Sequence, residues 1–162
     1  MKRVVKHELI EVVIPANTTA TRFQLPDAQN LRNVQTWGIQ MYYDTIIPKS
    51  IISNRAVINK VDFQKSFLTL ENYAGREFDK QAPISQYQTI ENGLNNDPAQ
   101  SVVASIQEKD FKNFVGQKIN FPKSYIDTVG VISDTFDKVF LISIYYTDKG
   151  ENFSQTSFSN KK

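Results

Sequence analysis

The fold of this chain is decided first by residues 139–146, which read VFLISIYY. This run is almost continuously apolar and is rich in β-branched and aromatic residues. Such a run is typical of a strand that is covered on both faces. We therefore predict that Val139–Tyr146 is a central strand.

The clearest half-buried strand lies earlier in the chain, from Val34 to Tyr43. Successive residues of a strand point to opposite faces of the sheet. The alternation predicts one face made of Trp37, Ile39, Met41 and Tyr43, and an opposite face made of Thr36, Gly38, Gln40 and Tyr42.

Further short strands are separated by residues that end or turn them. Pro15, Pro26 and the Ala74-Gly75 pair mark three of these boundaries. We predict strands over 4–14, 21–25, 56–62, 64–71, 76–80, 83–90, 117–121 and 125–132. Residues 99–114 fit a short helix or a strand equally well. Short strands at this spacing predict an all-β fold, a single jelly roll or β-sandwich of about eight antiparallel strands.

The chain of 162 residues has the length of one compact domain. We predict a β-sandwich domain over 1–147 and a polar C-terminal arm over 148–162. The segment 92–98 holds the densest cluster of turn-forming residues and is expected to be a long exposed loop.

The composition argues against several classes of protein. The net charge is only +2, with basic and acidic residues interspersed, which disfavours specific nucleic-acid binding. The absence of cysteine excludes disulfides and thiolate zinc sites. Charges near the N-terminus interrupt any signal peptide, and no apolar stretch is long enough for a membrane helix. We expect a protein made in a cytoplasm.

The sequence offers no ordered set of catalytic residues. Its single histidine, His7, is followed by Glu8, and neighbours in a strand point to opposite faces, so they form no dyad. We expect His7 to be a surface or interface residue. Glu71, Glu77 and Asp79 flank the Ala74-Gly75 turn and are interpreted as a solvated sheet edge that discourages wrong pairing.

The sequence also lacks the patterns of two other kinds of site, a calcium loop and a phosphate loop. Asp127, Asp134 and Asp137 lie close together in sequence but lack the Asp/Asn/Gly pattern of a calcium loop. The six glycines are too widely separated for a phosphate loop. We therefore predict no catalytic, cofactor-binding or metal-ligating residues, and no enzymatic activity.

An aromatic sugar-binding site is a separate alternative. Aromatic side chains can stack on a sugar ring, and the candidates in this sequence are Trp37, Tyr42, Tyr43 and Tyr73. For Trp37 we favour a place in the core. This alternative leaves open a carbohydrate- or receptor-binding β-sandwich module of a spike or fibre.

Four passages in the first half of the chain resemble small virion structural proteins of tailless or lipid-containing bacteriophages. They are FQLPD at 23–27, LRN at 31–33, WGI at 37–39 and KSFLTL at 65–70. The resemblance lies in the order of the expected elements: a strand, a turn, a connector, a long strand and a β-rich remainder.

The resemblance implies a single jelly-roll capsid subunit, either a penton or a minor capsid protein. It further implies a homo-oligomer, with a pentamer favoured, that contacts a neighbouring major capsid protein within the virion and lies near an internal membrane. Subunits of this kind meet through loop ends and strand edges, here the 46–55 loop, the 92–98 loop and the arm. Our candidate interface residues are Phe153, Phe158, Asn95 and Asn96.

Overall fold

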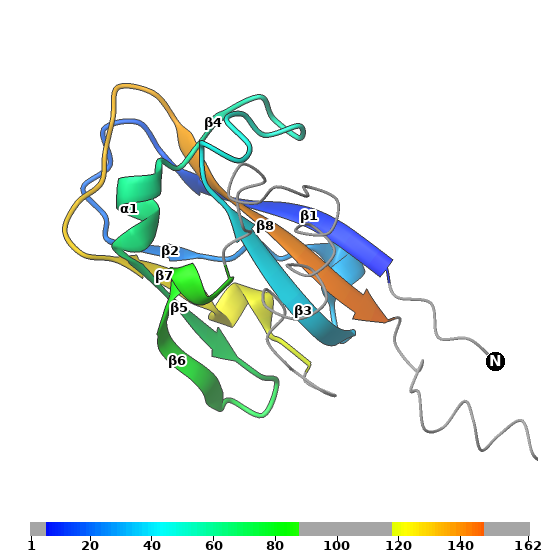
Figure 1. Cartoon of the computed structure of the whole chain (residues 1–162). Coiled ribbons are helices and arrows are strands. Elements are labelled where there is room, and N and C mark those ends of the chain that lie inside the picture. The colour runs from blue at the N-terminus through cyan, green and yellow to red at the C-terminus, as the bar shows by residue number, and fades with distance from the viewer. Residues whose placement is uncertain (1–5, 88–117, 148–162) are drawn as a thin grey trace, which may run out of the picture.

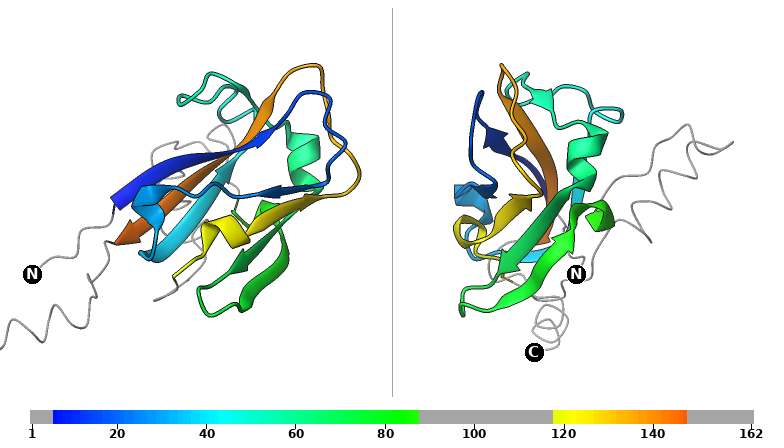
Figure 2. Two further views of the ribbon diagram at one scale, coloured as in Figure 1. Left: turned by 180° about the vertical axis from the view of Figure 1, so that it is seen from behind. Right: turned by 90° about the vertical axis from the view of Figure 1, so that its left-hand side faces the viewer.

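The computed structural model describes residues 6–87 and 118–147 and has the architecture of an all-β sandwich (Figure 1). Two mainly antiparallel sheets lie face to face as two layers (Figure 2). The described part of the chain holds no helix that is long and apolar enough to cross a membrane.

Sheet A is organised around its central strand. It contains β1 (Lys6–Ile14), β8 (Lys138–Thr147) and β3 (Gln35–Tyr42), in the order β1-β8-β3 with antiparallel pairing. The two-residue strand β4 (Ala56–Val57) pairs in parallel with the first residues of β8. The predicted central strand is therefore confirmed.

Sheet B has the order β2-β7-β5-β6 and is antiparallel throughout. Its strands are β2 (Arg22–Gln24), β7 (Tyr125–Thr128), β5 (Ser66–Glu71) and β6 (Glu77–Pro83). The turn between β5 and β6 contains Gly75, whose φ of 81° is a left-handed conformation that glycine adopts without strain. This confirms the predicted Ala74-Gly75 turn.

The helical elements are short. They are α1 (Lys60–Gln64) and the 3₁₀ turns η1 (Gln29–Leu31), η2 (Ile84–Tyr87) and η5 (Phe121–Lys123). Asn59 caps α1 by accepting a hydrogen bond from the backbone N–H of Asp62 at 2.8 Å.

A single apolar core lies between the two sheets. Phe140, Ile142 and Ile144 from β8 belong to it and are at most 1% exposed. Sheet B contributes Leu68 and Leu70 from β5 and Ile126 from β7. Every residue of β8 is buried from solvent except Tyr145, which is partly exposed. Among the described strands, β8 therefore contributes the most buried hydrophobic residues.

The predicted alternation of β3 fails at its start, where Thr36 is in register with the core residue Tyr146 and Trp37 lies on the other face. A β-bulge between Thr36 and Gly38 shifts the register of β3 against β8. As a result Trp37 leaves the face of Ile39, and its Nε1 donates to Thr147 Oγ1 at 2.9 Å on the opposite side of sheet A. Trp37 is half-buried there rather than part of the core between the sheets.

Four other predicted strands are shorter than expected or absent. The 56–62 segment is a strand only at β4, because the Asn59 cap starts α1. The 83–90 segment turns into η2, and its residues after 87 lie outside the described residues. Ile119 forms an isolated bridge in place of a 117–121 strand, and β7 ends at Thr128 rather than at residue 132. The predictions for 92–98, 99–114 and the 148–162 arm also lie outside the described residues.

The position of β8 gives a direct stability prediction. Phe140→Ala removes a fully buried ring and is expected to lower the free energy of unfolding by about 3–5 kcal/mol. Urea denaturation at neutral pH measures the change. The control is Val131→Ala, at a 53% exposed side chain, which should change stability by no more than about 0.5 kcal/mol. Equal effects of the two substitutions would contradict the placement of β8.

Candidate functional site

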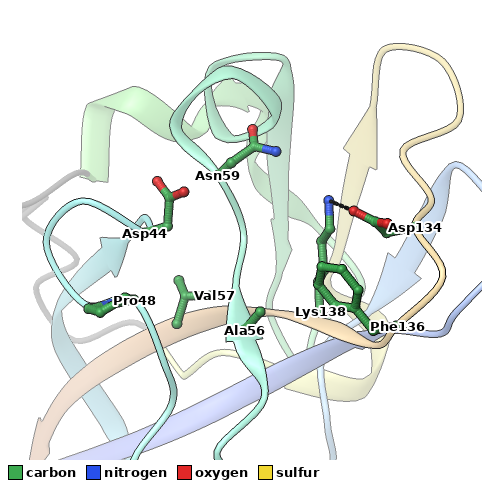
Figure 3. A pocket seen from close by; sticks show the side chains of 8 residues that line it. All are labelled: Asp44, Pro48, Ala56, Val57, Asn59, Asp134, Phe136 and Lys138. Carbon is green, nitrogen blue, oxygen red and sulfur yellow. Dashed lines mark ion pairs between the residues drawn. The ribbon is translucent and has the colours of Figure 1, made fainter.

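A pocket of about 320 Å³ lies at one end of the sandwich (Figure 3). We call this end the loop end. It is formed by the β1–β2 loop (15–21), the segment 43–59, helix α1 and the β7–β8 loop (129–137), and it occupies the top and left of Figure 1. The side chains that line the pocket are Asp44, Pro48, Ala56, Val57, Asn59, Asp134, Phe136 and Lys138.

The parallel pairing of β4 with β8 builds the wall of this pocket. Ala56 is in register with Lys138, and the N–H of Val57 donates to the carbonyl oxygen of Pro48 at 3.0 Å. On the side of α1, the N–H of Lys60 donates to Asp44 Oδ1 at 3.2 Å. Backbone pairing therefore holds segments that are far apart in sequence around one cavity.

Lys138 is the cationic residue among the side chains that line the pocket. It is only 8% exposed, and its Nζ lies 3.3 Å from Asp134 Oδ2 and 3.8 Å from Asp62 Oδ2 (Figure 3 marks the pair with Asp134). Asp62 also accepts from Asn59 Nδ2 at 3.0 Å. A buried ammonium needs such partners to offset the loss of hydration.

The electrostatics of Asp134 follow from these contacts. The N–H of Thr135 donates to Asp134 Oδ1 at 2.8 Å, and this bond, followed by the nearby Lys138 ammonium, lowers the pKa of the Asp134 carboxyl. The pocket thus contains carboxylates already engaged by donors. Within residues 6–87 and 118–147, no three His, Asp or Glu side chains are arranged to hold a metal ion.

A second polar cluster covers the face of sheet A that points away from sheet B. His7 Nε2 lies 3.0 Å from Ser143 Oγ, which lies 2.8 Å from the hydroxyl of Tyr42. The hydroxyl of Tyr145 donates to Gln40 Oε1 at 2.8 Å. We call these five residues from three strands the sheet A cluster.

Two features of the sheet A cluster bear on its chemistry. Gln40 is 1% exposed, and its Nε2 has no hydrogen-bond partner. The ring of His7 packs on Tyr145 with 5.0 Å between ring centroids. As predicted, Glu8 is directed elsewhere and accepts from Asn30 Nδ2. Among the described residues, the polar contact of His7 is with the neutral hydroxyl of Ser143 and not with a carboxylate that would orient a general base.

The three aspartates of the β7–β8 region do not converge. Asp127 pairs with Arg22 at 2.7 Å, while Asp137 accepts from the N–H of Ala16 at 2.8 Å and lies 3.6 Å from Arg55. With Asp134 facing Lys138, each carboxylate has its own cation. This arrangement explains why their proximity in sequence forms no common site.

The predicted carboxylate edge lies on β6, which is the last strand of sheet B. Glu77 accepts from the hydroxyl of Tyr125 at 3.1 Å and lies 3.9 Å from Lys80. Asp79 accepts from the hydroxyl of Tyr87, and burial together with this contact raises the pKa of Tyr87. Glu71, on β5, is in register with Glu77. These contacts are structural links between strands.

The aromatic residues considered for sugar stacking are dispersed. Tyr43 is 2% exposed in the core, and Tyr73 is 49% exposed at the turn between β5 and β6. Trp37 and Tyr42 lie on the outer face of sheet A, where both make hydrogen bonds. The structure therefore gathers no exposed aromatic platform from these four residues.

Sequence reasoning did not find the pocket or the sheet A cluster. The Asn59-x-x-Asp62 spacing was an available signal for the helix cap, but nothing local links Asp62 to Lys138. The candidate interface residues Phe153, Phe158, Asn95 and Asn96 lie outside the described residues.

Comparisons with known proteins found no matching family model, no matching curated protein and no matching solved structure.

The contacts of Lys138 predict a pH-dependent effect of its removal. Lys138→Met should raise the pKa of Asp134, while the Thr135 N–H keeps it below the ordinary value. A carboxyl with a lowered pKa stabilises the fold above its unfolded pKa and loses this contribution as pH falls through the folded pKa. The destabilisation by Lys138→Met should therefore be greatest near neutral pH and diminish in acid.

Carbon-detected NMR titration of the Asp134 carboxyl and urea denaturation between pH 7 and pH 3 test this prediction. Lys65→Met, which removes an exposed lysine without an ion pair in the described structure, is the matched control. An unchanged Asp134 titration in Lys138→Met would refute the assigned pairing.

Proposed function

We propose that the chain is a virion structural protein, a capsid subunit of the penton or minor-capsid type that self-assembles through symmetric interfaces. The order of the strands is the observation that carries this proposal. It supports the finer assignment of the sandwich as a single jelly roll.

In a jelly roll, a long antiparallel hairpin is wrapped into two sheets, so that the first strand pairs with the last and the second with the second last. Three such nested pairs are β1 with β8, β2 with β7 and β5 with β6. The wrapping also brings β8 beside β3 and β7 beside β5. All five pairings agree with the jelly-roll order.

The jelly-roll assignment requires one more strand beside β3. That strand is not among those of residues 6–87 and 118–147. In this assignment β4 is an addition at the start of β8, since its pairing is parallel and covers only two residues.

Jelly rolls are frequent in viral capsids and in lectins. The dispersed positions of Trp37, Tyr42, Tyr43 and Tyr73 disfavour the carbohydrate-binding alternative, which needs aromatic rings around one open site. For a capsid subunit the proposed partners are further copies of the chain and a neighbouring major capsid protein. The proposal includes no cofactor and no specific nucleic-acid binding.

The proposal predicts a discrete oligomer in solution. Light scattering at several protein concentrations and salt levels should give one fixed mass, and a pentamer is the result that favours a vertex subunit. A trimer would instead favour a spike or another capsomer. A strict monomer at every concentration would contradict self-assembly by this chain alone.

The candidate interface in the arm makes a second prediction. Phe153→Ser combined with Phe158→Ser should lower the oligomeric mass, because buried aromatic anchors dominate many interfaces. The matched control is Ser154→Ala combined with Ser159→Ala, which changes the neighbouring positions. The role of the arm is rejected if both variants keep the wild-type mass and circular dichroism spectrum.

A further inference from the structure

The exposed apolar side chains of the described residues are concentrated at the loop end. Eight large hydrophobic side chains are exposed in that part of the chain. Six of them belong to the loop end: Ile51, Ile52, Val61, Val129, Val131 and Phe136. Tyr73 lies at the opposite end, at the β5–β6 turn, and Val13 lies near the end of β1 (Figure 1). Such clustering marks a surface that contacts a partner.

The most exposed apolar residues are held on a tightly bonded loop. Ile51 is 85% exposed and Ile52 is 53% exposed. The adjoining Ser50 is 2% exposed; its N–H donates to the carbonyl oxygen of Arg55 at 2.9 Å, and its own carbonyl oxygen accepts from Asn54 at 2.8 Å. The loop therefore presents its two isoleucines in a fixed geometry, which reduces the entropy lost on binding.

The same loop is fastened to the body of sheet A. Ser53 Oγ donates to Glu11 Oε2 at 2.6 Å, and Glu11 also lies 3.7 Å from Arg55. Asn54 adopts a left-handed conformation with a φ of 59°, which asparagine tolerates better than most residues. These contacts hold the backbone on both sides of the isoleucines and leave their side chains outside.

At the loop end, acidic side chains have partners among the described residues, whereas two lysine side chains do not. The carboxylates Glu11, Asp62, Asp134 and Asp137 are each engaged by a cation or a hydrogen-bond donor. By contrast, Lys49 and Lys65 are exposed, and their ammonium groups have no ion pair or hydrogen bond in the described structure. The groups left available are thus apolar side chains, including the ring of Phe136, and the two lysines.

We propose that the loop end binds the surface of a lipid bilayer that contains anionic headgroups. Ile51 and Ile52 enter the interfacial region, while Lys49 and Lys65 face lipid phosphates. Exposed apolar side chains and unpaired lysines on one end of a molecule suit this environment. Protein interfaces are instead depleted in lysine.

The geometry of the loop end also suits a broad surface. Its exposed apolar residues come from separate segments: the 50–55 loop, α1 and the β7–β8 loop. These segments meet around one end, since the N–H of Val129 donates to the carbonyl oxygen of Lys65 at 3.0 Å and the pocket is lined by both Pro48 and Phe136. Two isoleucines and two lysines give weak attachment per copy, so binding strengthens with the number of copies presented together.

The test is sedimentation of the full-length chain with vesicles of phosphatidylcholine and phosphatidylglycerol, and with vesicles of phosphatidylcholine alone. We expect binding to the mixed vesicles that weakens at high salt. Ile51→Ser combined with Ile52→Ser should reduce the partition coefficient about tenfold, because two partly inserted side chains lose their transfer free energy. Tyr73→Ser, an exposed apolar residue at the opposite end, should bind like the wild type.

Several outcomes would overturn the proposal. One is a wild-type chain that binds neither kind of vesicle. Another is a double isoleucine variant, folded by circular dichroism, that binds as tightly as the wild type. If wild-type protein fails to bind vesicles and the double variant has a lower oligomeric mass, the loop end is a contact between protein subunits and not a lipid site.

Discussion

The ladder that β8 forms with β1 on one side and β3 on the other is the constraint on which the rest of the structure depends. Nine residues of β1, from Lys6 to Ile14, pair in unbroken register with β8. One face of β8 supplies Phe140, Ile142 and Ile144 to the core. The other face carries Ser143 and Tyr145, which join the sheet A cluster. A single strand therefore organises both the core and the outer polar face.

The first residues of β8 connect this ladder to the loop end. Lys138 is the first residue of the strand, pairs with Ala56 of β4 and reaches Asp134 and Asp62. Because its ammonium is buried, the surrounding carboxylates are held toward the protein. At the loop end Asp62, Asp134 and Asp137 each lie within 4 Å of a cation, while Lys49, Lys65 and several apolar side chains are exposed.

Much of the sandwich follows from local patterns. The apolar run at 139–146 predicted a buried central strand, and Pro15 and Ala74-Gly75 predicted boundaries that the structure has. The side of sheet A on which Trp37 lies was not predictable. It is set by a β-bulge, which depends on pairing with a strand more than a hundred residues away. Similarly, residues 56–62 were predicted as a strand, yet the hydrogen bond from the Asp62 N–H to the Asn59 side chain caps a helical turn there.

The candidate sites were harder to predict than the strands. The pocket requires Lys138, Asp62 and Asn59 to meet through tertiary pairing, and no spacing in the sequence signals this. His7 was correctly separated from Glu8 by strand alternation, but its contact with Ser143 depends on the β1–β8 register. Local periodicity thus predicted which residues share a face within one strand, while contacts between strands required the assembled sheet.

Self-assembly through symmetric contacts is tested most directly by electron cryomicroscopy of the purified full-length protein at high concentration. We expect closed rings with a single rotational symmetry, in which each subunit has the density of a two-sheet sandwich. Isolated subunits at every concentration, or open chains without a fixed number of copies, would contradict the proposed role as a capsid subunit.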